Sequence, residues 1–118
     1  MSGETSEPGN MGRMNDPDGS AWVTGLCGDT MEMYLVIENG TVTDATFFTD
    51  GCGSSRACGA AAVALAKGKT VEEVLRISPA DVADVAGVTS GNDIHCAILP
   101  VSTLHRALAD YLVRSGRG

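Results

Sequence analysis

The clearest pattern in the chain is a pair of apolar-rich runs at residues 31–38 and 41–49, separated by Asn39 and Gly40. Asn-Gly is the dipeptide that most readily supplies the two positive φ angles of a type I′ turn, so the runs predict a β-hairpin. Each face of the hairpin would carry four apolar residues: Met33, Leu35, Ile37 and Val42 on one, and Tyr34, Val36, Ala45 and Phe47 on the other. We therefore expect both faces of the sheet to be at least partly covered.

The segment before the hairpin predicts a short third strand and a tail. Residues 21–26 contain Trp22 and Val23, which suit a strand. Residues 1–20 are rich in Gly, Pro, Asn, Asp and Ser, a composition that buries too little apolar area to offset the entropy of ordering. We expect residues 1–20 to be a mostly flexible tail and residues 21–118 to form a single domain.

The second half of the chain predicts helices. An alanine-rich run should form a helix over about 54–67, capped by Ser54 or Ser55 and ended by Gly68. Two pairs with capping-box spacing then predict two short helices, and Pro79 suits a first helical position; the pairs are Thr70 with Glu73 and Ser78 with Asp81.

A last helix is expected over about 97–114. A helical stripe should pack it on the sheet, formed by Ile98, Val101, Leu104, Leu108 and Leu112. Pro100 lacks an N–H and belongs near a helix start, so this helix should begin close to Cys96. The predicted fold is α+β, with a small antiparallel sheet of about three strands packed against several helices.

Composition and charge reduce the number of function classes that fit this chain. Fifteen acidic residues against eight basic ones give a net charge of −7, which disfavours binding to nucleic acid or to an anionic membrane surface. The longest strongly apolar run, residues 60–66, is too short to cross a bilayer. The amino terminus has neither a signal-peptide nor a presequence pattern, so we expect a cytoplasmic protein. Small ligands, metals and protein partners remain.

Four cysteines supply the candidate chemistry: Cys27, Cys52, Cys58 and Cys96. In a reducing cytosol they suit metal ligands, reactive thiols or packing residues better than disulfides. Three of them lie near predicted helix starts, which favour the thiolate form. Cys27 precedes Asp29 by two positions, so in an extended segment both side chains would point to one side.

The spacing of these cysteines differs from the paired CxxC of zinc ribbons and from the clustered run of bacterial ferredoxins. The ligands would come from separate loops that meet at one end of the fold. An oxygen ligand among sulfurs would hold iron less firmly than another thiolate would, which suits a site that releases its cargo.

Three short motifs resemble the signature motifs of the U-type iron–sulfur cluster scaffold proteins, the IscU and NifU N-terminal family. They are Cys27-Gly28-Asp29, Gly51-Cys52-Gly53-Ser54 and Ile94-His95-Cys96, and the similarity extends over nearly the whole chain from about residue 10. The resemblance implies a scaffold rather than an enzyme. A cysteine desulfurase would deliver sulfur and an iron donor would supply iron. The resulting [2Fe–2S] cluster would pass to acceptor apo-proteins.

The resemblance also implies residue roles. Cys27, Cys52 and Cys96 would be cluster ligands, and Asp29 matches the aspartate linked to cluster lability. Cys96 would accept persulfide sulfur, and His95 matches an alternate ligand. Cys58 stands where relatives commonly have a small hydroxyl or aliphatic residue, and either a metal ligand or a packed core residue fits its position.

Two alternative functions remain from the sequence, a zinc-bound persulfide-accepting sulfurtransferase and a structural zinc module. In the U-type scaffold family, the zinc-dependent branch usually has a long insertion between the second and third cysteines and lacks the histidine. This chain has no such insertion and keeps His95, which favours the scaffold branch. The chaperone-binding Leu-Pro-Pro-Val-Lys segment of many relatives is replaced by residues 88–93, so dependence on the usual Hsp70-type chaperone is left open. The metal bound on purification, zinc included, and the oligomeric state, a homodimer included, are left open.

Overall fold

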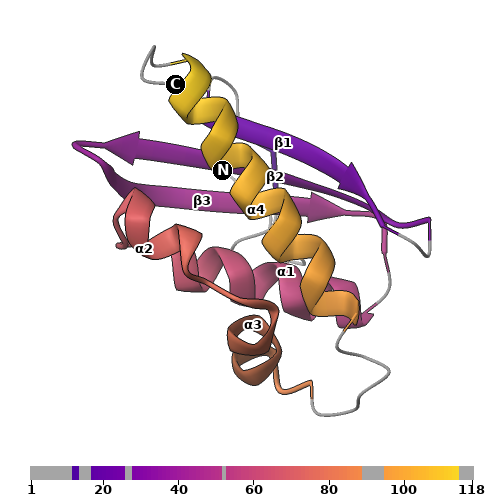
Figure 1. Cartoon of the computed structure of the whole chain (residues 1–118). Helices are drawn as coiled ribbons and strands as arrows, with labels where there is room; N and C mark the ends of the chain where they lie inside the picture. The colour runs from indigo at the N-terminus through magenta and orange to yellow at the C-terminus, as the bar shows by residue number, and fades with distance from the viewer. Residues whose placement is uncertain (1–11, 14–16, 26–27, 52, 89–94, 115–118) are drawn as a thin grey trace.

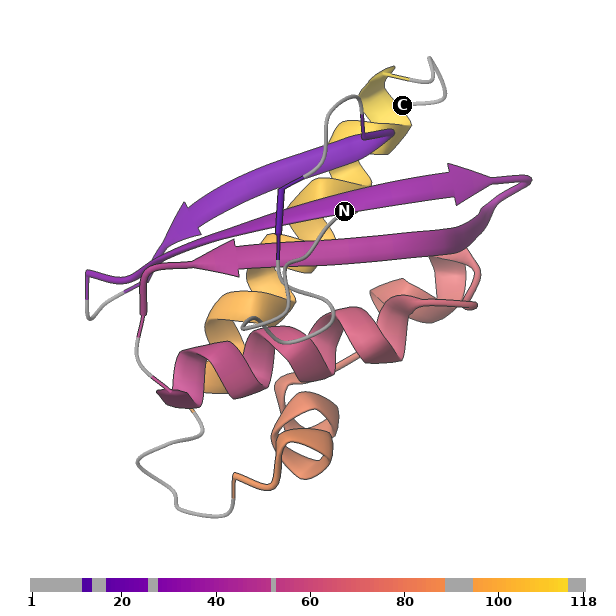
Figure 2. The same ribbon diagram turned by 180° about the vertical axis from the view of Figure 1, so that it is seen from behind.

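A computed structural model describes residues 12–13, 17–25, 28–51, 53–88 and 95–114. It has the predicted α+β architecture, with an antiparallel sheet in the strand order β1-β2-β3 (Figure 1). The elements in chain order are β1 (Gly19–Thr24), β2 (Thr30–Glu38), β3 (Thr41–Thr49), α1 (Gly53–Ala66), α2 (Val71–Leu75), α3 (Pro79–Ala86) and α4 (His95–Arg114). Helix α4 packs on β1 and β2, and α1 packs beside it on β3. Helix α3 lies against α1 and α4, farther from the sheet (Figures 1 and 2).

The hairpin is confirmed, with Asn39 at φ 55° and Gly40 at φ 76° in the connecting turn. Strand β1 pairs with β2 over its whole length, from Gly19 opposite Leu35 to Thr24 opposite Thr30. It begins two residues before the boundary expected between tail and domain, which was placed after Ser20.

The predicted division of the hairpin into faces is wrong for Ala45 and Phe47. Both are fully buried on the helix-covered face, opposite Leu35 and Met33 respectively. The cause is a β-bulge: Val36 pairs with Asp44 but Ile37 pairs with Val42, so Thr43 is an extra residue on β3. One extra residue reverses the side-chain alternation of the strand beyond it.

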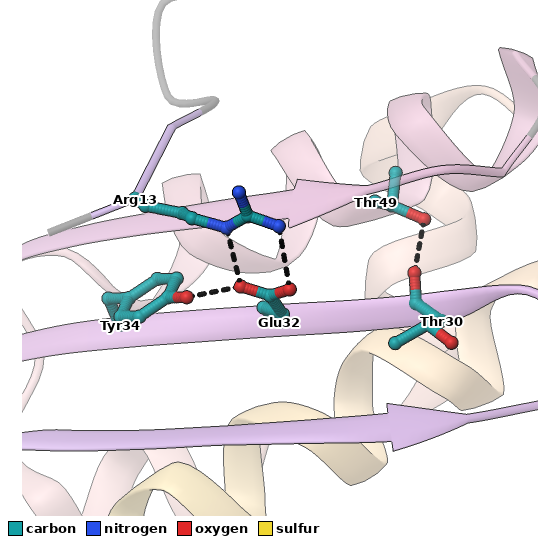
Figure 3. A network of polar contacts seen from close by, with 5 residues as sticks. All are labelled: Arg13, Thr30, Glu32, Tyr34 and Thr49. Atoms are coloured by element: carbon teal, nitrogen blue, oxygen red, sulfur yellow. Dashed lines mark hydrogen bonds and ion pairs between the residues drawn. The ribbon is translucent and has the colours of Figure 1, made fainter.

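The other face of the sheet has no described helix on it, and its side chains are half-exposed or, like Trp22, exposed. Arg13 lies across this face, where its guanidinium makes two hydrogen bonds to the Glu32 carboxylate at 2.9 and 3.0 Å (Figure 3). The same guanidinium lies 4.1 Å from the centre of the Phe48 ring, and the Tyr34 hydroxyl donates to Glu32. The hydrogen bond from Arg13 holds the pKa of Glu32 below its ordinary value.

The local helix signals are mostly confirmed. Both predicted capping boxes form, at Thr70 and at Ser78, and Gly68 follows α1 at φ 84°. The predicted cap of α1 is wrong, because the helix already begins at Gly53. Ser55 therefore lies inside the first turn, where its hydroxyl serves another partner.

Helix α4 begins at His95, close to the predicted start. Pro100 lies just beyond the first turn, so there is no N–H at position 100 to donate to the carbonyl of Cys96. The buried stripe differs from the prediction at Ile98, which is 45% exposed. The residues of α4 that are buried against the sheet and α1 include Ala97, Val101, Leu104, Ala107 and Leu108.

Within the described residues, no helix is both long enough and apolar enough to cross a membrane.

Candidate functional site

Three connections that border the cysteine motifs meet at one end of the sheet (Figure 1). They are the turn between β1 and β2, the passage from β3 into α1, and the first turns of α4. Cys27 and Cys52 lie outside the described residues, as does the side chain of His95. Within the described part, the site is therefore built from the segments that flank these motif positions.

Side-chain hydrogen bonds connect the first two segments. The Thr30 N–H donates to the Asp50 carboxylate at 3.0 Å. The Thr49 hydroxyl donates to the Thr30 carbonyl at 2.8 Å, as Figure 3 shows. The same hydroxyl accepts from the Gly51 N–H at 3.1 Å. These bonds fix the start of β2 against the residues that lead into the second motif.

Asp29 is held by its backbone and by its carboxylate. Its carbonyl accepts from the Gly25 N–H at 2.8 Å, which closes a turn in which Gly28 has φ 88°, a value that favours glycine. Its carboxylate oxygen Oδ2 accepts from the Ser55 hydroxyl at 3.2 Å. Ser55 lies in the first turn of α1, whose N-terminal end favours a negative charge.

Gly51 fits tightly beside this pair. A Cβ atom on Gly51 would lie 2.8 Å from Asp29 Oδ2 and equally close to the Cβ and Oγ of Ser55. Any larger residue there would displace the carboxylate or the hydroxyl. The glycine before the second cysteine is therefore required by the packing around Asp29.

The third segment reaches the same place through α4. A Cβ on Gly25 would lie 3.3 Å from Cδ2 of Leu99, so the second turn of α4 packs against the β1–β2 turn. Cys96, one residue into α4, is half-buried and packs against the edge of the hydrophobic core. A carboxylate and a thiol, on different segments, are thus carried to one end of the fold.

Cys58 lies elsewhere in the packing. Its side chain is 0% exposed and belongs to the hydrophobic core formed by the sheet, α1 and α4. Among the described residues, no group of three or more His, Cys, Asp or Glu side chains is close enough to hold a metal ion. Two of the ligands predicted from the sequence motifs, Cys27 and Cys52, lie outside the described residues.

The amino-acid sequence matches a known family. Residues 4–117 match the model of the NifU-like N-terminal domain. The chain belongs to this family. It is 36% identical over 111 residues to the iron–sulfur cluster assembly scaffold protein IscU 1 of Archaeoglobus fulgidus, an alignment that covers 93% of this chain and 72% of that protein. The IscU scaffold protein of Azotobacter vinelandii is 33% identical, with 92% of this chain and 88% of that protein covered.

Solved structures of NifU-like proteins share the fold. The N-terminal NifU-like protein from Brucella abortus superposes with a TM-score of 0.73 at 21% identity and covers 92% of this chain and 89% of its own. A putative iron–sulfur cluster assembly scaffold protein for the SUF system from Fervidobacterium islandicum gives a TM-score of 0.70 at 20% identity, with 85% and 87% covered. These two likenesses establish the α+β fold of the NifU-like domain.

One contact in the site was missed by sequence reasoning. The sequence predicts Ser55 as a candidate helix cap, yet its hydroxyl bonds a carboxylate 26 positions earlier in the chain. No local pattern signals such a pair. Only the meeting of the β1–β2 turn with the start of α1 brings the two together.

Proposed function

We propose that this protein is a scaffold on which a labile [2Fe–2S] cluster is assembled from iron and desulfurase-derived sulfur and then passed to acceptor apo-proteins. The observation that carries the proposal is the Asp29 carboxylate, held by Ser55 where the β1–β2 turn meets the start of α1. Membership of the NifU-like family and similarity to proteins named as iron–sulfur cluster assembly scaffolds support it.

The proposed terminal ligands are Cys27, Asp29, Cys52 and Cys96, which make two per iron. Thiolates suit iron–sulfur clusters, whereas a carboxylate oxygen is a harder and less firmly bound ligand in such a set. One iron would then carry a mixed sulfur and oxygen set, from which the cluster can be displaced by the thiols of an acceptor. His95 is the alternate ligand of the proposal.

The sulfur route assigns a second role to Cys96. Its thiolate would attack the outer sulfur of the desulfurase persulfide, so that the sulfane sulfur moves to Cys96 and the desulfurase cysteine leaves as a thiolate. The first turn of α4, where Cys96 lies, favours the thiolate by its helix N-terminal charge. Reduction of the transferred sulfur to sulfide needs electrons from a separate reductant of the thiol or ferredoxin class.

The burial of Cys58 supports a packing role for this cysteine and a ligand set of three thiolates with one carboxylate. The partners in the proposal are a cysteine desulfurase, an iron donor and acceptor apo-proteins.

Anaerobic reconstitution with iron, cysteine and a cysteine desulfurase tests the proposal. We expect the reconstituted protein to develop the visible charge-transfer absorption of a [2Fe–2S] centre. When an apo-ferredoxin is added, this protein should lose the absorption and the ferredoxin should gain it. A protein that binds Zn²⁺ and accepts persulfide sulfur but develops no such absorption would instead be a sulfurtransferase. A protein that unfolds when its metal is chelated would be a structural zinc module.

A further inference from the structure

Ser55 is a polar residue that is buried beside the hydrophobic core. Its side chain is 4% exposed, in the first turn of a helix whose following turns are alanine-rich and packed in the core. A buried hydroxyl without a hydrogen-bond partner lowers the stability of the fold, so the partner of the Ser55 hydroxyl indicates the role of this residue. That partner is Oδ2 of Asp29, at 3.2 Å.

The contact is enclosed on a third side by backbone. Gly51 lies so close that a Cβ atom would be 2.8 Å from both the carboxylate oxygen and the hydroxyl oxygen. Gly51 is itself fixed by the Thr49 hydroxyl, which accepts from its N–H. Oδ2 of the carboxylate is therefore bordered by the first turn of α1 on one side and by the backbone that follows β3 on the other.

Within the part of the chain that the structure describes, the Asp29 carboxylate accepts one hydrogen bond, which leaves it able to bind a cation. Each ionised carboxylate has about four lone-pair sites, and the Ser55 hydroxyl uses one of them on Oδ2. The group that orients a metal-binding carboxylate also sets how firmly it binds, and loss of such a partner typically costs roughly 10- to 100-fold in metal affinity or activity.

We propose that Ser55 is a positioning residue that holds the Asp29 carboxylate in the orientation in which it binds metal. This inference rests on the proposed function, in which Asp29 is a ligand, and it adds a residue outside the ligand set that controls the oxygen ligand. Ser55 acts only through Asp29, so its substitution matters only while Asp29 is present.

A double-mutant cycle with Zn²⁺ as the probe tests this dependence on the apo-protein. The dissociation constant for Zn²⁺ is measured for the parent, Ser55→Ala, Asp29→Ala and the double variant. Alanine is a good helix former, so the Ser55→Ala variant should keep α1. Ser102→Ala, on the half-buried side of α4, is the matched control for loss of a helical serine hydroxyl.

We expect Ser55→Ala to weaken Zn²⁺ binding about 10-fold in the parent and less than about 2-fold in the Asp29→Ala background. Ser102→Ala should bind Zn²⁺ as the parent does. An equal effect of Ser55→Ala in both backgrounds would show that Ser55 acts on the fold rather than on Asp29, and it would overturn the inference. Parent affinity in Ser55→Ala, or a parent protein that binds no Zn²⁺, would overturn it as well.

Cluster transfer gives a second readout and separates this inference from the proposed function. Ser55→Ala should change the rate of transfer to an apo-ferredoxin in the same direction as Asp29→Ala, and the double variant should match Asp29→Ala alone. A parent that builds no cluster refutes the proposed function, whereas the Zn²⁺ cycle still decides the Ser55 inference. A parent that transfers its cluster at the same rate as Ser55→Ala refutes the inference alone.

Discussion

Cys58→Ala should lower stability without changing the bound cluster. The Cys58 side chain is 0% exposed and belongs to the hydrophobic core. Removal of its sulfur loses the transfer free energy of one buried heavy atom and leaves a small cavity, together about 1 to 2 kcal/mol. For a domain of this size that corresponds to a fall in Tm of about 4 °C per kcal/mol.

Val63→Ala is the matched control, since Val63 is also fully buried on α1. It loses two methyl groups and should cost about 2 kcal/mol. Thermal unfolding followed by circular dichroism on the apo-proteins gives the two Tm values, and visible absorption after reconstitution gives the cluster. The reasoning is refuted if Cys58→Ala melts like the parent but has an altered cluster spectrum, because that would make Cys58 a ligand.

Three further variants test other parts of the structure. Asp29→Ala should slow cluster transfer to an apo-ferredoxin about 10-fold, because the oxygen ligand is lost; transfer at the parent rate would exclude that role. Gly59→Ala should destabilise the domain by about 1 to 3 kcal/mol in urea unfolding, since its Cβ would lie 2.6 Å from the Phe47 ring, and an unchanged midpoint would show that α1 shifts freely on the sheet. The pKa of Glu32 is lowered in the fold, so the ionised carboxylate stabilises the folded state. This stabilisation is present above the ordinary pKa of 4.5 and is lost as the pH falls through the lower folded pKa. Arg13→Ala should therefore reduce the fall in Tm on acidification below about pH 4.5, and an identical acid profile would mean that the ion pair adds nothing.

The elements of this fold follow from local signals where those signals are complete within a few residues. The Asn39-Gly40 turn, the capping box at Thr70 and the stop at Gly68 each depend on neighbours in sequence, and each appears as predicted. The β-bulge at Thr43 could not be predicted in this way. It depends on the pairing of β3 with β2, and the sequence of one strand does not indicate which of its residues stays unpaired. The face of Phe47 could therefore not be assigned from alternation.

Local sequence signals also fail to predict which residues of α4 are buried. Ile98 and Val101 both fit an apolar helical stripe, but only the position of α4 across β1 and α1 decides that Val101 is buried and Ile98 is exposed. In the site, the motifs named Asp29 from the sequence. Its partner Ser55 could not be named, since that contact depends on how two distant turns meet.

We propose that Cys27, Asp29, Cys52 and Cys96 together bind a [2Fe–2S] cluster, and ⁵⁷Fe Mössbauer spectroscopy of the anaerobically reconstituted protein distinguishes these ligands. We expect two inequivalent ferric sites in equal amounts, one with only sulfur ligands and one with mixed sulfur and oxygen ligands. In Asp29→Ala the spectrum of the second site should change while the first stays as it was. A single all-sulfur environment that is unaffected by Asp29→Ala, or iron without the signature of a coupled pair, would show that these four residues do not bind such a cluster together.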